Sequence, residues 1–111
     1  MTDIPVKTLI YNHEKFFIPE AAPDLDAVIE YELTGEEGGD YIIAIKDGKC
    51  KVTEGKAEAP VVTVTADGRD FGDVLLGRAN GMQYFMTGKI RLAGDLNLAM
   101  KLTSFFKMSG Q

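Results

Sequence analysis

The spacing of apolar residues is helical at the start of the chain. In PVKTLIYNHEKFF, residues 5–17, the apolar residues fall roughly on one side of a helix, and this set is Val6, Leu9, Ile10 and Phe17. Pro5 suits the first turn of such a helix, and Pro19 would end it. We therefore predict a helix over 5–17, followed by a loop or a short helical turn over 19–27.

The spacing then changes to every second residue, which is typical of strands. The alternating stretches are residues 28–33, 40–46, 49–54 and 61–67. Turn residues separate them, and Asp47-Gly48 between two such stretches is a strong hairpin signal. We predict that residues 28–67 form an antiparallel meander with one face on a core and one face in water.

The last third of the chain returns to helical spacing around one further strand. A helix that begins near Asp67 or Asp70 ends by Gly77, a shorter one contains residues 82–86, and residues 88–93 form a strand that Gly94 breaks. Asp95 can cap a final helix. This order predicts one domain over 1–111 with an α+β fold, in which helices pack on one face of a five-stranded, mostly antiparallel sheet.

The predicted final helix carries more apolar surface than one packing face requires. One stripe is Leu98, Leu102, Phe105 and Phe106, and a second holds Leu96, Ala99 and Met100. A surface helix needs an apolar stripe only a little over 100° wide. The surplus can enter a core, a subunit interface, a membrane surface or a cavity for an apolar ligand. The flexible methionines at 82 and 86, beside aromatic residues, suit such a pocket.

Composition narrows the class of protein. The chain has 45% hydrophobic and 26% charged residues, a single cysteine, and no apolar run of about 18 residues. The start lacks the order of a secretory signal, so we expect a cytoplasmic protein. The net charge of −5 argues against a nucleic-acid partner. Residues 1–77 hold 7 basic and 16 acidic residues, whereas residues 78–111 hold five basic residues and one acid, so the basic third can face an anionic surface.

Few residues are candidates for chemistry. His13 next to Glu14 lacks an obvious catalytic partner, and we expect it to be a polar surface residue. Cys50 stands between two lysines that could stabilise a thiolate, but a small apolar filler of a strand is the favoured interpretation. The acidic turn GEEGGD, residues 35–40, lacks the ligand spacing of a calcium loop. We expect no enzyme activity, no metal and no cofactor.

A string of motifs resembles the sterol carrier protein type 2 family of lipid-binding domains. A DGK turn at 47–49 is followed by EGK-x-x-x-P-x-V-T-V-T from Glu54 to Thr65 and by D-F-x-x-x-x-x-G from Asp70 to Gly77. Then come G-M-x-x-F-M-x-G-K-I-x-L-x-G-D over 81–95 and L-A-M-K-L over 98–102. The end, Ser109-Gly110-Gln111, matches no peroxisomal address, so we expect a free-standing prokaryotic member, for which sterol is not the expected ligand.

The resemblance implies an apolar tunnel between the sheet and the helices that binds a fatty acid, acyl-CoA or phospholipid without chemistry. The implied lipid-binding residues are Phe71, Val74, Leu75, Met82, Phe85, Met86, Ile90, Leu92, Leu96, Met100, Leu102, Phe105 and Phe106. The basic C-terminal third would contact an anionic membrane transiently. The alternative is an accessory or oligomerisation module, such as a dimer, whose apolar surface contacts a partner of lipid metabolism.

Overall fold

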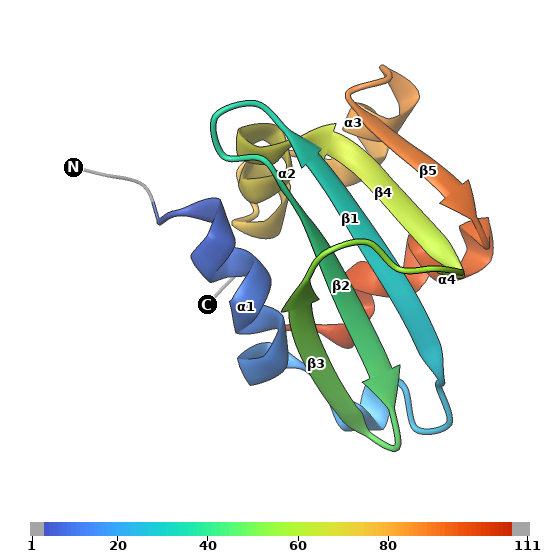
Figure 1. Cartoon of the computed structure of the whole chain (residues 1–111). Helices are drawn as coiled ribbons and strands as arrows, with labels where there is room; N and C mark the ends of the chain where they lie inside the picture. The colour runs from blue at the N-terminus through green and yellow to red at the C-terminus, as the bar shows by residue number, and fades with distance from the viewer. Residues whose placement is uncertain (1–3, 108–111) are drawn as a thin grey trace.

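The computed structural model describes residues 4–107, apart from the side chain of Thr103, so the terminal Ser109-Gly110-Gln111 lies outside the described residues (Figure 1). The elements in chain order are α1 (Val6–Phe16), the 3-10 turn η1 (Pro19–Ala21), β1 (Ala27–Thr34), β2 (Gly39–Lys46), β3 (Lys49–Glu54), β4 (Val62–Asp67), α2 (Gly68–Leu75), α3 (Gly81–Met86), β5 (Ile90–Gly94), α4 (Leu96–Lys101) and η2 (Leu102–Phe105). The α+β fold with five strands and a helical layer is confirmed.

The five strands form one mixed sheet in the order β3-β2-β1-β4-β5. Neighbouring strands are antiparallel except β1 and β4, which run parallel with Tyr31 opposite Val64. The predicted hairpin between β2 and β3 is confirmed, because Asp47 and Gly48 both have positive φ angles, 54° and 74°. The predicted four-strand meander is wrong for its last strand, because β4 pairs with β1 rather than with β3.

The connection between β3 and β4 explains this difference. Residues 55–61 are too many for a tight hairpin, and they cross the sheet in front of β2 and β1 (Figure 1). Val61 N–H donates to the Val28 carbonyl oxygen at 2.8 Å, which sets β4 beside β1. The crossing segment also covers part of the face that we expected in water. Glu30 on that face is only 3% exposed, and it accepts a hydrogen bond from Ala57 N–H at 3.0 Å.

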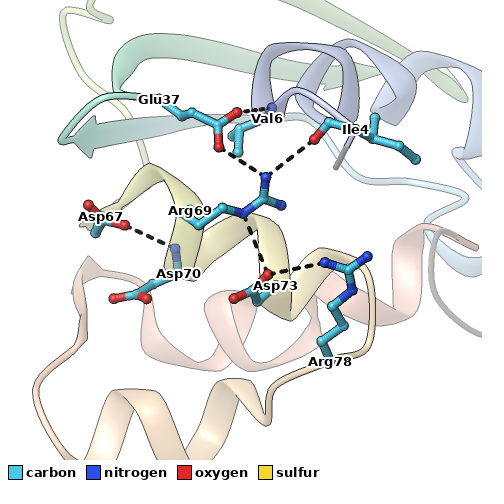
Figure 2. Close-up of polar contacts among 8 residues, drawn as sticks. All are labelled: Ile4, Val6, Glu37, Asp67, Arg69, Asp70, Asp73 and Arg78. Atoms are coloured by element: carbon cyan, nitrogen blue, oxygen red, sulfur yellow. Dashed lines mark hydrogen bonds and ion pairs between the residues drawn. The ribbon is translucent and has the colours of Figure 1, made fainter. Parts of the chain in front are cut away.

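The helices cover the opposite face of the sheet; in Figure 1, α3 and α4 lie behind the strands and α1 lies at the left beside β3. Inward-facing strand residues such as Ile29, Ile43 and Val62 are fully buried there, in one core cluster with the α1 residues Val6 and Ile10. The start of α1 has no side-chain cap of its own. Glu37, from the turn between β1 and β2, supplies one, since its Oε1 accepts from Val6 N–H at 3.0 Å (Figure 2).

The C-terminal helix is shorter than its apolar spacing predicts. The α-helical part ends at Lys101, η2 follows, and Phe106 is extended. Two backbone hydrogen bonds draw the chain out of the helix. Ile18 N–H donates to Phe105 O at 2.7 Å, and Lys107 N–H donates to Phe16 O at 2.9 Å. The prediction of one continuous helix through Phe106 is therefore wrong, because pairing with the segment after α1 replaces the helical hydrogen bonds.

Candidate functional site

A cavity of about 450 Å³ lies between the inner face of the sheet and the helices α2, α3 and α4. This volume falls in the range of small-molecule sites. The lining consists of His13, Tyr31, Val64, Phe71, Val74, Leu75, Gly77, Ala79, Asn80, Gly81, Met82, Phe85, Ile90, Leu92, Ala99, Met100, Leu102 and Phe106. No aspartate, glutamate, lysine or arginine belongs to this lining within residues 4–107, so the cavity suits an apolar ligand.

Three short capped helices form the helical wall of the cavity. Asp67 begins α2 by accepting from Asp70 N–H, and Asn80 begins α3 by accepting from Gln83 N–H, both at 3.1 Å. Asp95 begins α4 by accepting from Leu98 N–H at 3.1 Å. Side-chain caps satisfy the first amides of a helix and fix where it starts. The caps therefore determine which apolar side chains of each helix turn toward the sheet.

Ten of the thirteen residues that the family resemblance implied line this cavity. They are Phe71, Val74, Leu75, Met82, Phe85, Ile90, Leu92, Met100, Leu102 and Phe106. Three lie elsewhere. Met86 and Leu96 are 77% and 47% exposed, and Phe105 is buried beside a smaller groove formed with residues 21–25, Leu98 and Lys101.

The cavity reaches the molecular surface at α3 and at α4. Met82 of α3 and Met100 of α4 both line it, yet they are 50% and 45% exposed. Met86 and Leu96 extend this exposed apolar surface on the same two helices. We call these four residues the apolar rim. Large exposed apolar side chains in a group are typical of sites of contact or entry.

His13, Tyr31 and Asn80 are polar residues of the lining that sequence reasoning missed, and the first two are buried together. His13 is 1% exposed, so the prediction that it lies on the surface is wrong. The signal was present in the sequence, because His13 stands four residues after Leu9 and three after Ile10, on the same helical stripe. Its Nδ1 donates to the Leu9 carbonyl oxygen at 3.1 Å, and its Nε2 lies 2.9 Å from the Tyr31 hydroxyl oxygen.

The environment of this pair keeps both side chains neutral. Burial lowers the pKa of His13 to about 4, because an imidazolium ion there would lose its hydration. Burial also raises the pKa of Tyr31. The ring of Phe71 packs edge-on against Tyr31, with centroids 4.8 Å apart, and the ring of Phe106 packs at 4.6 Å against His13. The pair is therefore an uncharged polar point in an apolar wall.

Cys50 packs as the favoured interpretation of the sequence expected. Its side chain is half-buried and contacts the apolar core from β3. Burial, followed by the nearby charge of Glu14, raises the pKa of the thiol to about 12. The flanking residues Lys49 and Lys51 are exposed and do not stabilise a thiolate. A protonated thiol is a poor nucleophile.

Metal-binding groups and membrane-spanning helices are both lacking in the described part of the chain. Within residues 4–107, His, Cys, Asp and Glu side chains form no group of three or more that could hold a metal ion. The helices of the same residues are all too short or too polar to cross a bilayer.

Comparison with known proteins gives a consistent family. The family model for SCP-2 sterol transfer proteins matches residues 14–107. Hydroxysteroid dehydrogenase-like protein 2 of Xenopus tropicalis is 32% identical over 84 residues, which are 75% of this chain and 20% of that protein. The Pongo abelii protein of the same name is 35% identical over 79 residues, 68% of this chain and 18% of that one. The chain thus spans about a fifth of these relatives.

Solved structures resemble the chain over nearly its whole length. Palmitated SCP2L2 from Aedes aegypti is 25% identical with a TM-score of 0.73, and the match covers 94% of this chain and 93% of that one. Sterol carrier protein domain 2 of Helicoverpa armigera is 32% identical with a TM-score of 0.69, covering 89% and 80% of the two chains.

Proposed function

The chain belongs to the SCP-2 sterol transfer family, and from this membership we propose that it binds a lipid in the cavity between sheet and helices and transfers it without chemical change. One observation carries the proposal, the apolar cavity of about 450 Å³. The similarity to palmitated SCP2L2 from Aedes aegypti supports a fatty acyl ligand. We propose a fatty acid, acyl-CoA or phospholipid, held by the ten implied residues in the lining.

The energy of burying an acyl chain supports useful affinity. About fifteen methylenes at ~0.8 kcal/mol each amount to roughly 12 kcal/mol before ordering and desolvation costs. The binding free energy that is left after these costs is compatible with dissociation constants from micromolar to nanomolar. The proposal of binding without chemistry is supported by the neutral state of His13 and by the protonated thiol of Cys50, which lack the activation that acid–base or nucleophilic catalysis requires.

The first experiment is native mass spectrometry of the purified protein, followed by organic extraction and identification of the extract. A bound species with the mass of a fatty acid, acyl-CoA or phospholipid is the expected result. If no lipid is found and a fluorescent fatty acid does not bind, the carrier function is refuted.

A substitution that partly fills the cavity tests the same proposal in a second way. Ala99 of α4 lines the cavity, and Ala99→Leu adds three carbon atoms inside it. We expect at least a tenfold weaker binding of the fluorescent fatty acid. Asn97→Leu is the matched control, because it places the same side chain on the exposed side of the same helix. Equal affinities for the two variants would mean that the ligand binds elsewhere.

The apolar rim favours one alternative, an accessory or oligomerisation module. Met86 at 77% exposure is the most exposed residue of the four. In that case the rim would bind another copy of the chain or a partner of lipid metabolism. Size-exclusion chromatography separates the alternatives, because a carrier keeps its oligomeric state when lipid is added or removed.

A further inference from the structure

The hydrogen bonds around His13 have a fixed direction. A carbonyl oxygen can only accept, so the contact with Leu9 O places the imidazole proton on Nδ1. In the neutral ring Nε2 then has a lone pair and no hydrogen. The Tyr31 hydroxyl must therefore donate to Nε2 across the 2.9 Å that separates them.

This direction leaves the Tyr31 oxygen as an acceptor. Its only hydrogen points to His13, and no group that the structure describes within residues 4–107 donates a hydrogen bond to the oxygen itself. Tyr31 and His13 both line the cavity, so the bond that joins them lies at its wall. The third polar residue of the lining, Asn80, uses its side-chain oxygen to cap α3.

Other titratable groups near the pair do not change the direction of the hydrogen bond from Tyr31 to His13. Cys50 on β3 acts on Tyr31 only through a minor electrostatic effect that raises the pKa of Tyr31, and burial keeps the Cys50 thiol protonated. Glu14, the neighbour of His13 on α1, directs its carboxylate to β3, where Oε2 accepts from Val52 N–H at 2.6 Å. From α2 and from the C-terminal segment, the uncharged rings of Phe71 and Phe106 pack against the pair.

We propose that the Tyr31 oxygen, aligned by His13, is the polar anchor of the cavity and selects lipids whose buried end carries an O–H donor. This inference rests on the proposed lipid binding and specifies its ligand class. A long-chain alcohol satisfies the anchor directly. A carboxylate has acceptors only, so a fatty acid binds there as R–COOH, after R–COO⁻ has taken up one proton from solvent. An ester has neither donor nor charge.

The test compares three ligands of one chain length, decanol, decanoic acid and methyl decanoate, by isothermal titration calorimetry between about pH 6 and pH 9. We expect decanol to bind five- to tenfold more tightly than the ester, at a dissociation constant that does not change with pH. The constant for decanoic acid rises about tenfold per pH unit, because the bound form carries one more proton than the free anion.

Two variants assign the effect to the anchor. In Tyr31→Phe with His13→Leu the cavity wall is wholly apolar, so decanol and the ester bind equally and the ester keeps its wild-type affinity. A decanol preference that the double variant retains overturns the proposal. Tyr31→Phe alone tests whether His13 Nε2 replaces the Tyr31 oxygen as the hydrogen-bond acceptor.

The wild-type data decide the proposal even if the variants do not fold. Binding of decanoic acid that is independent of pH, or equal affinity for decanol and the ester, overturns the anchor while leaving the carrier function intact. If none of the three ligands binds at any pH, lipid binding in this cavity fails as well.

Discussion

Glu37 connects three separated parts of the chain through one carboxylate. Oε1 accepts from Val6 N–H at the start of α1, and Oε2 accepts from Arg69 Nη1 on α2 at 2.9 Å (Figure 2). Arg69 also donates to Ile4 O at 3.4 Å and contacts Asp73 through Nε at 3.5 Å. Charge-assisted hydrogen bonds of this kind are stronger than neutral ones. A single turn residue thereby holds two helices against the sheet.

Removal of that carboxylate should destabilise the protein measurably. We expect Glu37→Ala to lower the free energy of unfolding by about 1–2 kcal/mol, the usual cost of a lost helix cap. Urea denaturation followed by circular dichroism measures it. Glu36→Ala is the control, since Glu36 is an exposed neighbour in the same turn and its loss should cost less than about 0.5 kcal/mol. Equal losses in the two variants would contradict the cap.

His13 makes stability depend on pH in a definite direction. Its pKa is about 4 in the folded protein, against an ordinary value of 6.5. The unfolded chain therefore binds a proton at His13 more readily than the folded chain does. The contribution of neutral, buried His13 to the free energy of unfolding is fully present above about pH 6.5, and it is lost as the pH falls toward 4. At ~1.4 kcal/mol per pKa unit, the loss is about 3 kcal/mol.

Urea unfolding of the wild type and of His13→Gln between about pH 7.5 and pH 4.5 checks this dependence. The variant keeps an amide that can hydrogen-bond but does not titrate. We expect the wild type to lose more stability than the variant over this interval. Parallel curves would show that His13 does not titrate as its burial requires.

At the scale of elements, local signals predict well and long-range pairing does not. The caps Asp67 and Asp95 and the Asp47-Gly48 hairpin act over a few residues, and the structure confirms each of them. The predicted alternation in β1 is interrupted at Glu30, which is buried on the outer face. The position of β4 beside β1 depends on where a seven-residue connection leads, which alternation does not encode. The end of α4 likewise depends on hydrogen bonds with the distant segment Phe16–Ile18.

The same distinction applies to the cavity. Family motifs cover residues 47–102, and the implied residues from that region supply half of the lining. His13 and Tyr31 come from the first third of the chain, where the match to the family motifs is weak. Because both residue types are polar, the search for apolar lining residues did not select them. Only packing of α1 onto β1 shows that their side chains meet at the cavity wall.

A close backbone approach at the end of β5 gives an element-scale prediction. Gly94 has a φ of 97°, and a Cβ there would collide with the carbonyl group of Val61, next to the Asp95–Val61 hydrogen bond of 2.8 Å. Gly88 has a φ of 84°, but a Cβ there would meet nothing within 4 Å. A side chain at either position would be strained by the positive φ angle, but only a side chain at position 94 would also collide with neighbouring backbone.

We expect Gly88→Ala to cost about 1 kcal/mol and Gly94→Ala about 3 kcal/mol or more. Thermal and urea unfolding of both variants measure the difference, which belongs to the junction that positions α4. A similar loss in the two variants would mean that the chain relaxes around a Cβ at position 94.

At the scale of the whole molecule, charge is separated from the start of the chain to its end. Lys101 follows the rim residue Met100, and both Lys101 and Lys107 are exposed. Because Lys101 adjoins the apolar rim, we propose that the basic C-terminal third meets an anionic bilayer during transfer. Attraction between opposite charges speeds encounter and weakens as salt is added.

We therefore expect Lys101→Glu with Lys107→Glu to slow lipid transfer from anionic vesicles several-fold and to reduce its salt dependence. A fluorescent fatty acid exchanged between vesicles reports the rate. Lys46→Glu with Lys51→Glu is the matched control, since it changes the net charge equally on exposed strand positions of the opposite sheet face. An unchanged rate for the first pair would refute the membrane contact.

The parallel pairing of β1 with β4 also determines at which stage of folding the cavity forms. The β1–β2–β3 hairpins join near neighbours and can form early, whereas β4 must first cross two strands, a long loop closure that slows folding. Apart from His13 and Tyr31, the cavity lining comes from β4 and the residues after it. A ligand then finds its site only in the native state and stabilises that state alone. Bound lipid would thus prolong the lifetime of the folded chain without hastening its formation.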